Sequence, residues 1–447
     1  MQSIVHSYLD IFGRFFLKRM FSVGFGTLLF SPFAFAVTSS LSGPVPALSQ
    51  SYGAGITSTV IYTITNSLPN PVSVNVSGIS GGIIRTTVEN DCGQMALGSS
   101  SCNIGIAITP TSSQIGTSIS QTLNVSLNGK KPLTSKIAFQ VSNAYAYIAN
   151  YYNSSVTKCM VDPITGLFNT CQDSGVGGIF SGPVQIIMRS FGGNKFAYVS
   201  NITNSTILRC NVNPVTGQFS SCVDSGAGTQ LSAVWGMSFY DTSNGNTYMY
   251  VPNPAKNQIF QCPINTTTGL LGTCVDSGAG AVFPGMNYVN AASYIKFNSS
   301  GGNTYVYVTE GNNGSVYVTK CLVNFNSGTF SNCSNLNVGF PGPTGIAFTK
   351  IGNQSTAYIT NAYNTVIYTC TVDSQGLLNC ANPIPGGWSE LTQAKIGGQT
   401  LLYSANGFGT NNVSQCLIDP NTGALSACQD SGVSSTPFSA PFSIVFF

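Results

Sequence analysis

The chain has 447 residues, of which 43% are hydrophobic and only 6% charged, and it contains 49 Gly and 14 Cys. Charged side chains make up about a quarter of an ordinary soluble domain, so uncharged polar residues, mainly Asn, Ser, Thr, Gln and Tyr, must form most of the polar solvent-exposed surface of this chain. With 16 Lys+Arg against 13 Asp+Glu and no long basic run, the composition argues against an electrostatic nucleic-acid binder.

The first 36 residues have the order of a secretory signal. Arg14, Lys18 and Arg19 precede an uncharged stretch over residues 20–36, which ends in Ala-Phe-Ala. A cationic, then apolar, then small-residue order is typical of export signals, and this apolar part is short and interrupted by Pro. We therefore expect residues 1–36 to be removed, the alternative being a retained anchor. No later apolar run reaches the roughly 20 residues of a membrane helix.

Residues 37–142 are expected to form an immunoglobulin-like β-sandwich. Polar and apolar residues alternate over 59–65 and 121–126, and turns rich in Gly, Ser and Pro separate such segments. About a hundred residues of short alternating strands suit a sandwich. This region holds one pair of cysteines, Cys92 and Cys102, which we expect to be bridged.

Residues 143–447 are built from a repeat of about 50 residues, a period that suits four-stranded propeller blades. The anchor of the repeat is a pair of cysteines. The pairs are Cys159/Cys171, Cys210/Cys222, Cys262/Cys274, Cys321/Cys333, Cys370/Cys380 and Cys416/Cys428. Between the two cysteines lies a turn such as Asp162-Pro-Ile-Thr-Gly166, where Pro presets φ and Gly supplies a positive φ.

Each repeat predicts four strands: an inner strand, an aromatic strand that mostly ends in Asn, and one strand for each cysteine. The first unit lacks its inner strand, whereas the last inner strand, residues 441–447, has nothing after it. A six-bladed β-propeller whose C-terminal strand completes the first blade accounts for both the missing first strand and the unmatched last strand. Closing the ring also hides the sheet edges. Nothing shows helical periodicity, so the chain is expected to be all-β.

One disulfide per blade is expected, because directly opposed side chains of an antiparallel pair come within bonding reach. Each closes a loop of about 13 residues, worth roughly 3 kcal/mol in the chain-entropy model. An even cysteine count with an export signal predicts an oxidising compartment, so the protein is expected in the periplasm, at the cell surface or in the medium. Metal sites are the weaker alternative, because two thiolates without imidazole leave zinc short of ligands.

Two stretches resemble known families. The run from Asp91 to Ile104, with Cys92 and Cys102, resembles the Ig-like domains of MSP/ASH type in bacterial surface proteins, which implies a spacer or binding module. Tyr198-Val-Ser-Asn201 and Tyr358-Ile-Thr-Asn361 resemble the Tyr-Val-Thr-Asn signature of the YVTN, lactonase-like and NHL-type propellers of exported bacterial proteins. This second resemblance covers residues 145–447 and implies blades rather than a chemistry. The cysteine pairs depart from that pattern.

Catalytic side chains are scarce. The single histidine, His6, lies in the predicted signal, so the mature chain lacks the base of a Ser/His/Asp or Cys/His mechanism. The resemblance to lactonases therefore carries over no catalytic residue. Asp162, Asp373 and Asp419 are expected to cap their own turns. Four aspartates of an Asp-Ser-Gly motif are expected to bond backbone rather than bind calcium. They are Asp173, Asp224, Asp276 and Asp430.

Candidate ligand-binding residues lie at the ends of the aromatic strands. Five of these ends carry an asparagine and the fourth carries Glu310. The asparagines are Asn150, Asn201, Asn253, Asn361 and Asn406. If the ends point into the channel, this set resembles the Glu/Asn metal site of six-bladed lactonases and phosphotriesterases; alternatively each asparagine bonds the backbone of the loop after its strand. Trp235 and Trp388 lie close to inner strands, either to stack on a ligand or to pack between blades.

These patterns predict an exported, non-enzymatic β-propeller that binds a protein or glycan partner at one face, as a monomer without a cofactor. A calcium-dependent lactonase or esterase using Glu310 and the channel asparagines is one alternative. A purely structural surface protein is the other.

Overall fold

The computed structural model describes most of the chain after the predicted signal, which lies outside the described residues. Described are residues 39–45, 48, 51–66, 72–79, 82–87, 92, 94–95, 100–228, 231–253, 256–280, 294–311, 314–407, 410–433 and 437–447. Over these ranges the regular structure is β, apart from short 3-10 turns such as Ser112–Gln114. None of the helices found in them is long and apolar enough to cross a membrane.

Two sheets form in the N-terminal part and share one core. The first contains β1 (Ser40–Val45), β3 (Ser58–Asn66), β7 (Ser100–Ile108) and β5 (Ile84–Thr86), in that order. The second contains β2 (Ser51–Gly53), β9 (Leu133–Ser142), β8 (Ser118–Leu127), β4 (Val72–Ser77) and β6 (Gln94–Met95). Alternate side chains such as Ile64 and Ile104 from one sheet and Val125 from the other meet in this core. The immunoglobulin-like type of this sandwich stays a prediction.

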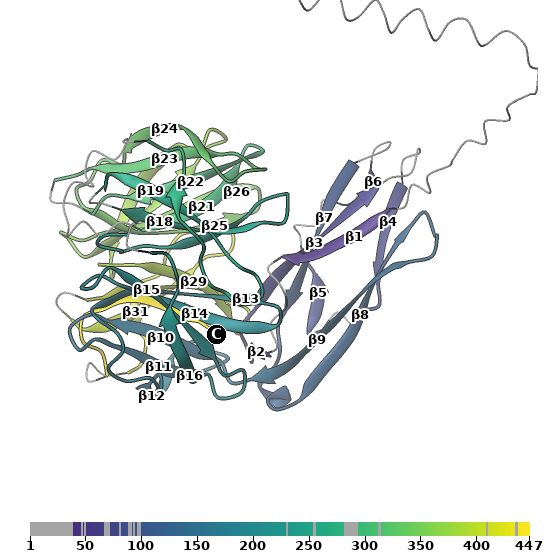
Figure 1. The fold of residues 1–447 in the computed structure, drawn as a ribbon, viewed down its shortest axis with the longest axis horizontal. Coiled ribbons are helices and arrows are strands. Elements are labelled where there is room, and N and C mark those ends of the chain that lie inside the picture. Colours follow the sequence, from purple (N-terminus) through teal and green to yellow (C-terminus); the bar gives the residue numbers. More distant parts are fainter. Residues whose placement is uncertain are drawn as a thin grey trace, which may run out of the picture. The chain divides into compact units, whose positions relative to one another are not determined.

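Six four-stranded antiparallel sheets, called blades 1 to 6 here, make up the rest of the described chain (Figure 1). Blade 1 holds β33 (Pro441–Phe446), β10 (Tyr145–Asn150), β11 (Ser155–Val161) and β12 (Phe168–Asp173); blade 2 holds β13 (Pro183–Phe191), β14 (Asn194–Asn201), β15 (Thr206–Val212) and β16 (Phe219–Asp224); blade 3 holds β17 (Ser238–Asp241), β18 (Thr247–Asn253), β19 (Gln258–Pro263) and β20 (Val275–Asp276). Blade 4 holds β21 (Ile295–Ser300), β22 (Asn303–Thr309), β23 (Tyr317–Val323) and β24 (Phe330–Asn337); blade 5 holds β25 (Pro343–Ile351), β26 (Gln354–Asn361), β27 (Val366–Val372) and β28 (Leu378–Pro385); blade 6 holds β29 (Leu391–Ile396), β30 (Gln399–Asn406), β31 (Asn412–Ile418) and β32 (Gln429–Asp430). The first strand of each blade is its inner strand.

The blades close into a ring. The C-terminal strand β33 pairs with β10, which confirms the predicted completion of the first blade. Buried clusters join blades 1 and 2, 2 and 3, 3 and 4, 4 and 5, and 5 and 6. A further cluster, with Phe168, Tyr403 and Ile444, joins blade 6 back to blade 1. The fold is therefore a β-propeller, and apolar packing between neighbouring blades runs around the whole ring.

One buried tyrosine per blade fastens that blade to the next. Its hydroxyl donates a hydrogen bond to the carbonyl of the glycine in the turn between the two cysteine strands of the following blade. The six pairs, called the Tyr–Gly latches, are Tyr147 with Gly217, Tyr198 with Gly269, Tyr250 with Gly328, Tyr307 with Gly376, Tyr358 with Gly423 and Tyr403 with Gly166, at 2.5–2.9 Å. Burial raises the pKa of all six hydroxyls, so they remain donors. The latches explain why this Tyr and this Gly recur in every repeat.

All seven predicted disulfides are present, and no described cysteine is free. The bridge of the sandwich joins Cys92 to Cys102. Each blade has one bridge of its own, and the six are Cys159–Cys171, Cys210–Cys222, Cys262–Cys274, Cys321–Cys333, Cys370–Cys380 and Cys416–Cys428. Seven disulfides indicate an oxidising, extracytoplasmic compartment.

The strand positions of the bridged cysteines differ in part from the prediction. Only Cys171 and Cys380 lie directly opposite their partners in the strand pairing. In blades 2 and 4, the pairs Cys210–Cys222 and Cys321–Cys333 lie at a shift of register, where the second cysteine strand has an extra residue.

The prediction that both cysteines of every blade lie on strands is wrong for Cys274 and Cys428. These two precede the short strands β20 and β32, because the chain before them pairs with its neighbour as the isolated bridges Ile264–Leu271 and Ile418–Leu425 and not as a continuous ladder. The Cα–Cα distances of the six blade disulfides are nevertheless all 3.9–4.2 Å. A blade disulfide therefore needs close backbones rather than a regular ladder.

The aspartates of the turns bond backbone, as predicted. Each Asp-Ser-Gly aspartate accepts a hydrogen bond from the N–H of its own motif's glycine. Asp162, Asp373 and Asp419 cap their turns in the same way. Bonds from the Thr165 backbone and hydroxyl lower the pKa of Asp162. These carboxylates are therefore committed to the turns between strands.

Candidate functional site

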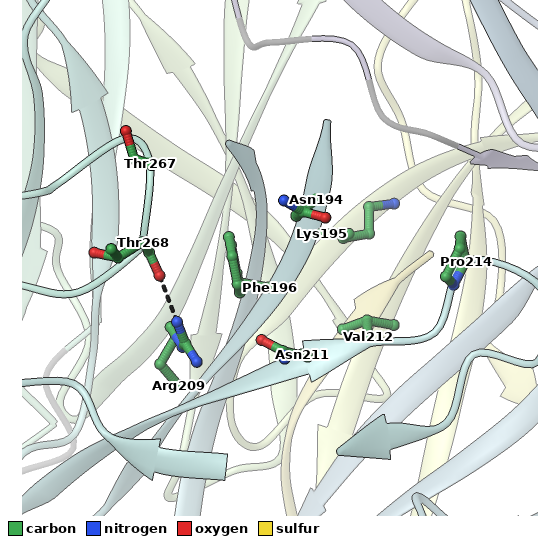
Figure 2. A pocket seen from close by; sticks show the side chains of 9 residues that line it. All are labelled: Asn194, Lys195, Phe196, Arg209, Asn211, Val212, Pro214, Thr267 and Thr268. Carbon is green, nitrogen blue, oxygen red and sulfur yellow. Dashed lines mark hydrogen bonds between the residues drawn. The ribbon is translucent and has the colours of Figure 1, made fainter. Parts of the chain in front are cut away.

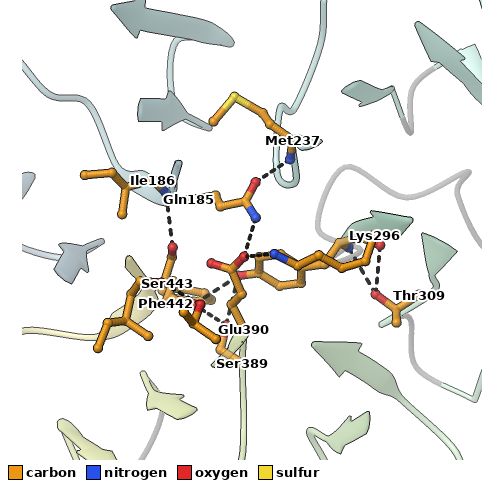
Figure 3. Close-up of polar contacts among 12 residues, drawn as sticks. Gln185, Ile186, Met237, Lys296, Thr309, Ser389, Glu390, Phe442 and Ser443 are labelled. Carbon is orange, nitrogen blue, oxygen red and sulfur yellow. Dashed lines mark hydrogen bonds and ion pairs between the residues drawn. The ribbon is translucent and has the colours of Figure 1, made fainter. Parts of the chain in front are cut away.

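A buried carboxylate lies where inner strands of different blades meet. Glu390, directly before β29, accepts hydrogen bonds from Gln185 of β13 and Lys296 of β21, the latter at 3.0 Å between Nζ and Oε1 (Figure 3). Gln185 in turn accepts the backbone N–H of Met237. Glu390, Gln185 and Lys296 are called the channel network below. It joins blades 2, 4 and 6 across the ring.

The channel network compensates a buried charge. The Glu390 side chain is 1% exposed and that of Lys296 is 26% exposed. A carboxylate removed from water needs a counter-charge and hydrogen bonds, and Lys296 supplies one of each. The second carboxylate oxygen of Glu390 is buried and makes no hydrogen bond to described protein atoms. Glu390 is not among the candidate ligand-binding residues predicted from the sequence.

Hydroxyl groups surround the network. The hydroxyl of Tyr294 lies 2.9 Å from that of Ser389, and both donate to the carbonyl of Phe442. Burial, with the nearby charge of Glu390 in addition, raises the pKa of Tyr294 well above its usual value. Tyr294 therefore stays protonated and acts as a donor. These contacts hold three inner-strand segments together rather than form an acid–base pair.

Trp235 and Trp388 come together on Phe442. Their rings lie 5.5 Å and 5.3 Å from that of Phe442, and Tyr151 contacts the same ring at 5.6 Å between centroids. Trp235 is 7% exposed. Both tryptophans therefore pack against a shared phenylalanine of β33, with Trp235 buried and Trp388 half-buried.

Four of the five predicted asparagines at the aromatic-strand ends bond to nearby strands and loops. Asn150 donates to the Thr157 hydroxyl at 2.8 Å, and Asn406 donates to that of Ser414 at 2.7 Å. Asn201 accepts the N–H of Ser181, and Asn361 accepts that of Tyr363. Asn253 is buried at the end of β18.

Glu310 is fully buried beyond β22, and its carboxylate accepts the hydroxyls of Thr319 at 2.6 Å and Ser315 at 3.3 Å. These partners belong to its own blade, whereas the side chains that meet at the channel network come from inner strands. In the described part of the chain, no group of three or more His, Cys, Asp or Glu could hold a metal ion.

A pocket of about 790 Å³ lies along the C-terminal halves of four consecutive inner strands, β17, β21, β25 and β29. It is called the strand-end pocket below. Its aromatic, amide, hydroxyl and ammonium groups belong to Tyr240, Phe297, Phe348, Asn298, Asn353, Gln393, Ser299, Thr304, Thr349, Lys350 and Lys395. Its volume lies within the range of ligand sites in proteins. The sequence did not predict this pocket, because its residues differ from blade to blade. A comparison of repeats finds only the residues that recur.

A second, smaller pocket of about 370 Å³ lies between blade 2 and a turn of blade 3 (Figure 2). Arg209 lies over the Phe196 ring at 4.8 Å and donates to the carbonyl of Thr268. Burial lowers the pKa of the neighbouring Lys195 to about 8. Arg209 already bonds to blade 3 through Thr268. This pocket is therefore a weaker candidate for a ligand-binding site than the strand-end pocket.

Neither the family models nor the curated proteins contain a match to this sequence. Among solved structures, the chain is similar to the periplasmic gluconolactonase of Pseudomonas aeruginosa at 14% identity, with 84% of this chain and 99% of that chain covered and a TM-score of 0.43. It is also similar to a protein of unknown function from Bacteroides caccae (12% identity, 68% and 99% covered, TM-score 0.42). An auxiliary nutrient binding protein from Bacteroides ovatus is similar at 10% identity (88% and 97% covered, TM-score 0.37). These likenesses assign no activity to this chain.

Proposed function

We propose that this protein is an exported, non-enzymatic β-propeller that binds a partner through the strand-end pocket. The observation that carries the proposal is the pocket itself, whose described lining offers rings, amides, hydroxyls and two ammonium groups but no carboxylate. Such a lining can hold a ligand by stacking, hydrogen bonding and charge. Its described lining has no carboxylate or imidazole to serve as a general base.

The buried carboxylates fit a structural role better than a catalytic one. Glu390 is held by Lys296 and Gln185, and Glu310 by Thr319 and Ser315. Holding the blades rigid in this way keeps the strand ends in fixed positions, which favours binding because little order must be gained when the ligand arrives.

A pocket-filling variant tests the proposal. Wild-type protein is screened against immobilised oligosaccharides and peptides, and each ligand found is titrated against Thr349→Trp, which places an indole in the half-buried lining of β25. Thr122→Trp, on an exposed position of β8, is the matched control. We expect ligands to be lost with Thr349→Trp and kept with Thr122→Trp. A ligand that both variants bind like wild type would place the site elsewhere.

The alternative of a calcium-dependent lactonase has its own test. Calcium is titrated by calorimetry into wild type and Glu310→Gln, and both are assayed on a panel of lactones. Lactone hydrolysis that requires calcium and disappears with Glu310→Gln would replace the binding proposal by the enzymatic one.

A further inference from the structure

We propose that the ligand of the strand-end pocket is an acidic oligosaccharide, a chain of sugar rings that carry carboxylate or sulfate groups. The inference rests on the proposed function and specifies its ligand class. It combines three features of the pocket: its aromatic rings, its hydrogen-bonding groups and the sign of its charge.

The aromatic rings of the pocket are half-buried and held in place. Tyr240 and Phe297 stack at 4.8 Å between centroids, and Phe348 packs against the latch residue Tyr307 at 4.8 Å. Rings fixed by their neighbours present flat apolar surface at little cost in side-chain entropy. The C–H faces of pyranose rings match such surfaces.

Amide and hydroxyl groups line the same pocket as these rings. Ser299, two residues after Phe297, has its hydroxyl 3.0 Å from that of Thr304 on the next strand. Thr349 follows Phe348, and Gln393 donates to the Thr349 hydroxyl at 3.0 Å. Side chains that both donate and accept suit ligand hydroxyls, which do the same.

The charge of the pocket is positive. Lys350 and Lys395 are exposed in its lining, on the neighbouring inner strands β25 and β29. Neither belongs to the two ion pairs seen in the described residues, which are Arg189–Asp241 and Lys296–Glu390. Asp241, the carboxylate next to Tyr240, is therefore already neutralised by Arg189.

In a chain with only 6% charged residues, two lysines at one pocket without a carboxylate partner favour an anion. Ammonium groups on two successive blades further suit a ligand whose negative charge repeats along its length. Aromatic rings and groups that match ligand hydroxyls in one pocket favour a saccharide over an acidic peptide.

Calorimetry with three acidic tetrasaccharides tests this ligand class: oligogalacturonate, oligomannuronate and chondroitin sulfate. The carboxyl-reduced form of the galacturonate tetramer and a tetraglutamate peptide are titrated alongside. Each probe is measured with wild type, with Lys350→Gln/Lys395→Gln, and with Lys130→Gln/Lys131→Gln, a control that removes the same charge from exposed positions of the N-terminal sandwich. Circular dichroism checks that all variants fold.

We expect at least one acidic tetrasaccharide to bind wild type and the control alike. Its affinity should fall about tenfold in Lys350→Gln/Lys395→Gln, because two exposed ion pairs are together worth roughly a factor of 2 to 30. Binding by none of the three, or equal binding by the double variant, overturns the inference. Preference for the carboxyl-reduced tetramer or for tetraglutamate also overturns it. In those last two cases, loss of that ligand with Thr349→Trp would leave the proposed binding function standing.

Discussion

The Tyr–Gly latches predict a specific pattern of coupled mutations at the contact between blades 3 and 4. The hydroxyl of Tyr250 donates to the carbonyl of Gly328 at 2.7 Å and accepts a hydrogen bond from Gln261 at 3.0 Å. Both Tyr250 and Gly328 are buried. Tyr250→Phe therefore leaves a buried carbonyl without its donor, a loss of about 1–3 kcal/mol in the free energy of unfolding.

Gly328→Ala perturbs the same latch from the other side. Gly328 has φ +72°, and an added Cβ would lie 2.2 Å from the Tyr250 hydroxyl and 2.9 Å from the Gln261 side-chain nitrogen. The strained backbone and the clash together should cost more than about 1 kcal/mol. The clash is with the very atom that Tyr250→Phe removes. In the Tyr250→Phe background, the cost of Gly328→Ala should therefore shrink by about 1 kcal/mol or more.

Urea unfolding of wild type, both single variants and the double variant, all with disulfides intact, measures this coupling. Tyr152→Phe, at an exposed tyrosine, is the matched control and should change stability by less than about 0.5 kcal/mol. Costs that add within about 0.3 kcal/mol would show that the hydroxyl and the glycine do not meet, and the latch would be refuted.

Further predictions concern pH, charge and sulfur. Burial raises the pKa of the latch tyrosines above the usual value near 10, so their contribution to the free energy of unfolding should be complete below about pH 10 and should decrease at higher pH. Urea unfolding midpoints that do not change up to about pH 11 would contradict this. Burial lowers the pKa of Lys195 to about 8, so Lys195→Met should stabilise the fold at pH 7 and less so at pH 9, whereas an effect independent of pH would speak against a buried ammonium. Glu390→Gln should destabilise by about 1–3 kcal/mol, and Glu390→Met/Lys296→Met should cost less than the sum of its single variants, which thermal unfolding checks. Replacing Cys321 and Cys333 by Ser should cost about 2–4 kcal/mol by urea unfolding, with no loss of any other bridge in peptide mapping; a loss of under 0.5 kcal/mol would mean that the bridge does not constrain the blade.

The ring could be predicted from the sequence because its structural features recur in every repeat. Cysteine pairs, turn glycines and the aromatic strand recur with each blade, and each has a fixed structural task, such as the bond from Tyr403 to Gly166 that joins the last blade to the first. The unmatched first and last strands were enough to predict the pairing of β33 with β10. The spacing of the cysteines predicted their partners but not that Cys274 and Cys428 lie outside strands, because a bridge forms between close backbones with or without a ladder.

The comparison of repeats was a poorer guide to the buried polar residues of the channel network. Glu310 stood out because it broke a row of asparagines, yet its partners Thr319 and Ser315 lie in its own blade. Glu390 and Lys296 broke no motif, and only the closed ring brings them within 3.0 Å of each other. Their positions on or directly before inner strands, where polar residues face other blades, were the one available signal. Residues that vary among blades are the ones a propeller can devote to a ligand.

Hydrogen exchange of the C-terminal strand tests the central claim, a closed ring that fixes the strand-end pocket, most directly. In the closed ring β33 is the inner strand of blade 1, paired with β10 and packed in the cluster that joins blades 6 and 1. Mass spectrometry of the peptide covering Pro441–Phe446 should show amides protected as strongly as those of β14, a second strand within a blade. Exchange of the paired amides within seconds, while β14 stays protected, would mean that the ring is open and would contradict the account.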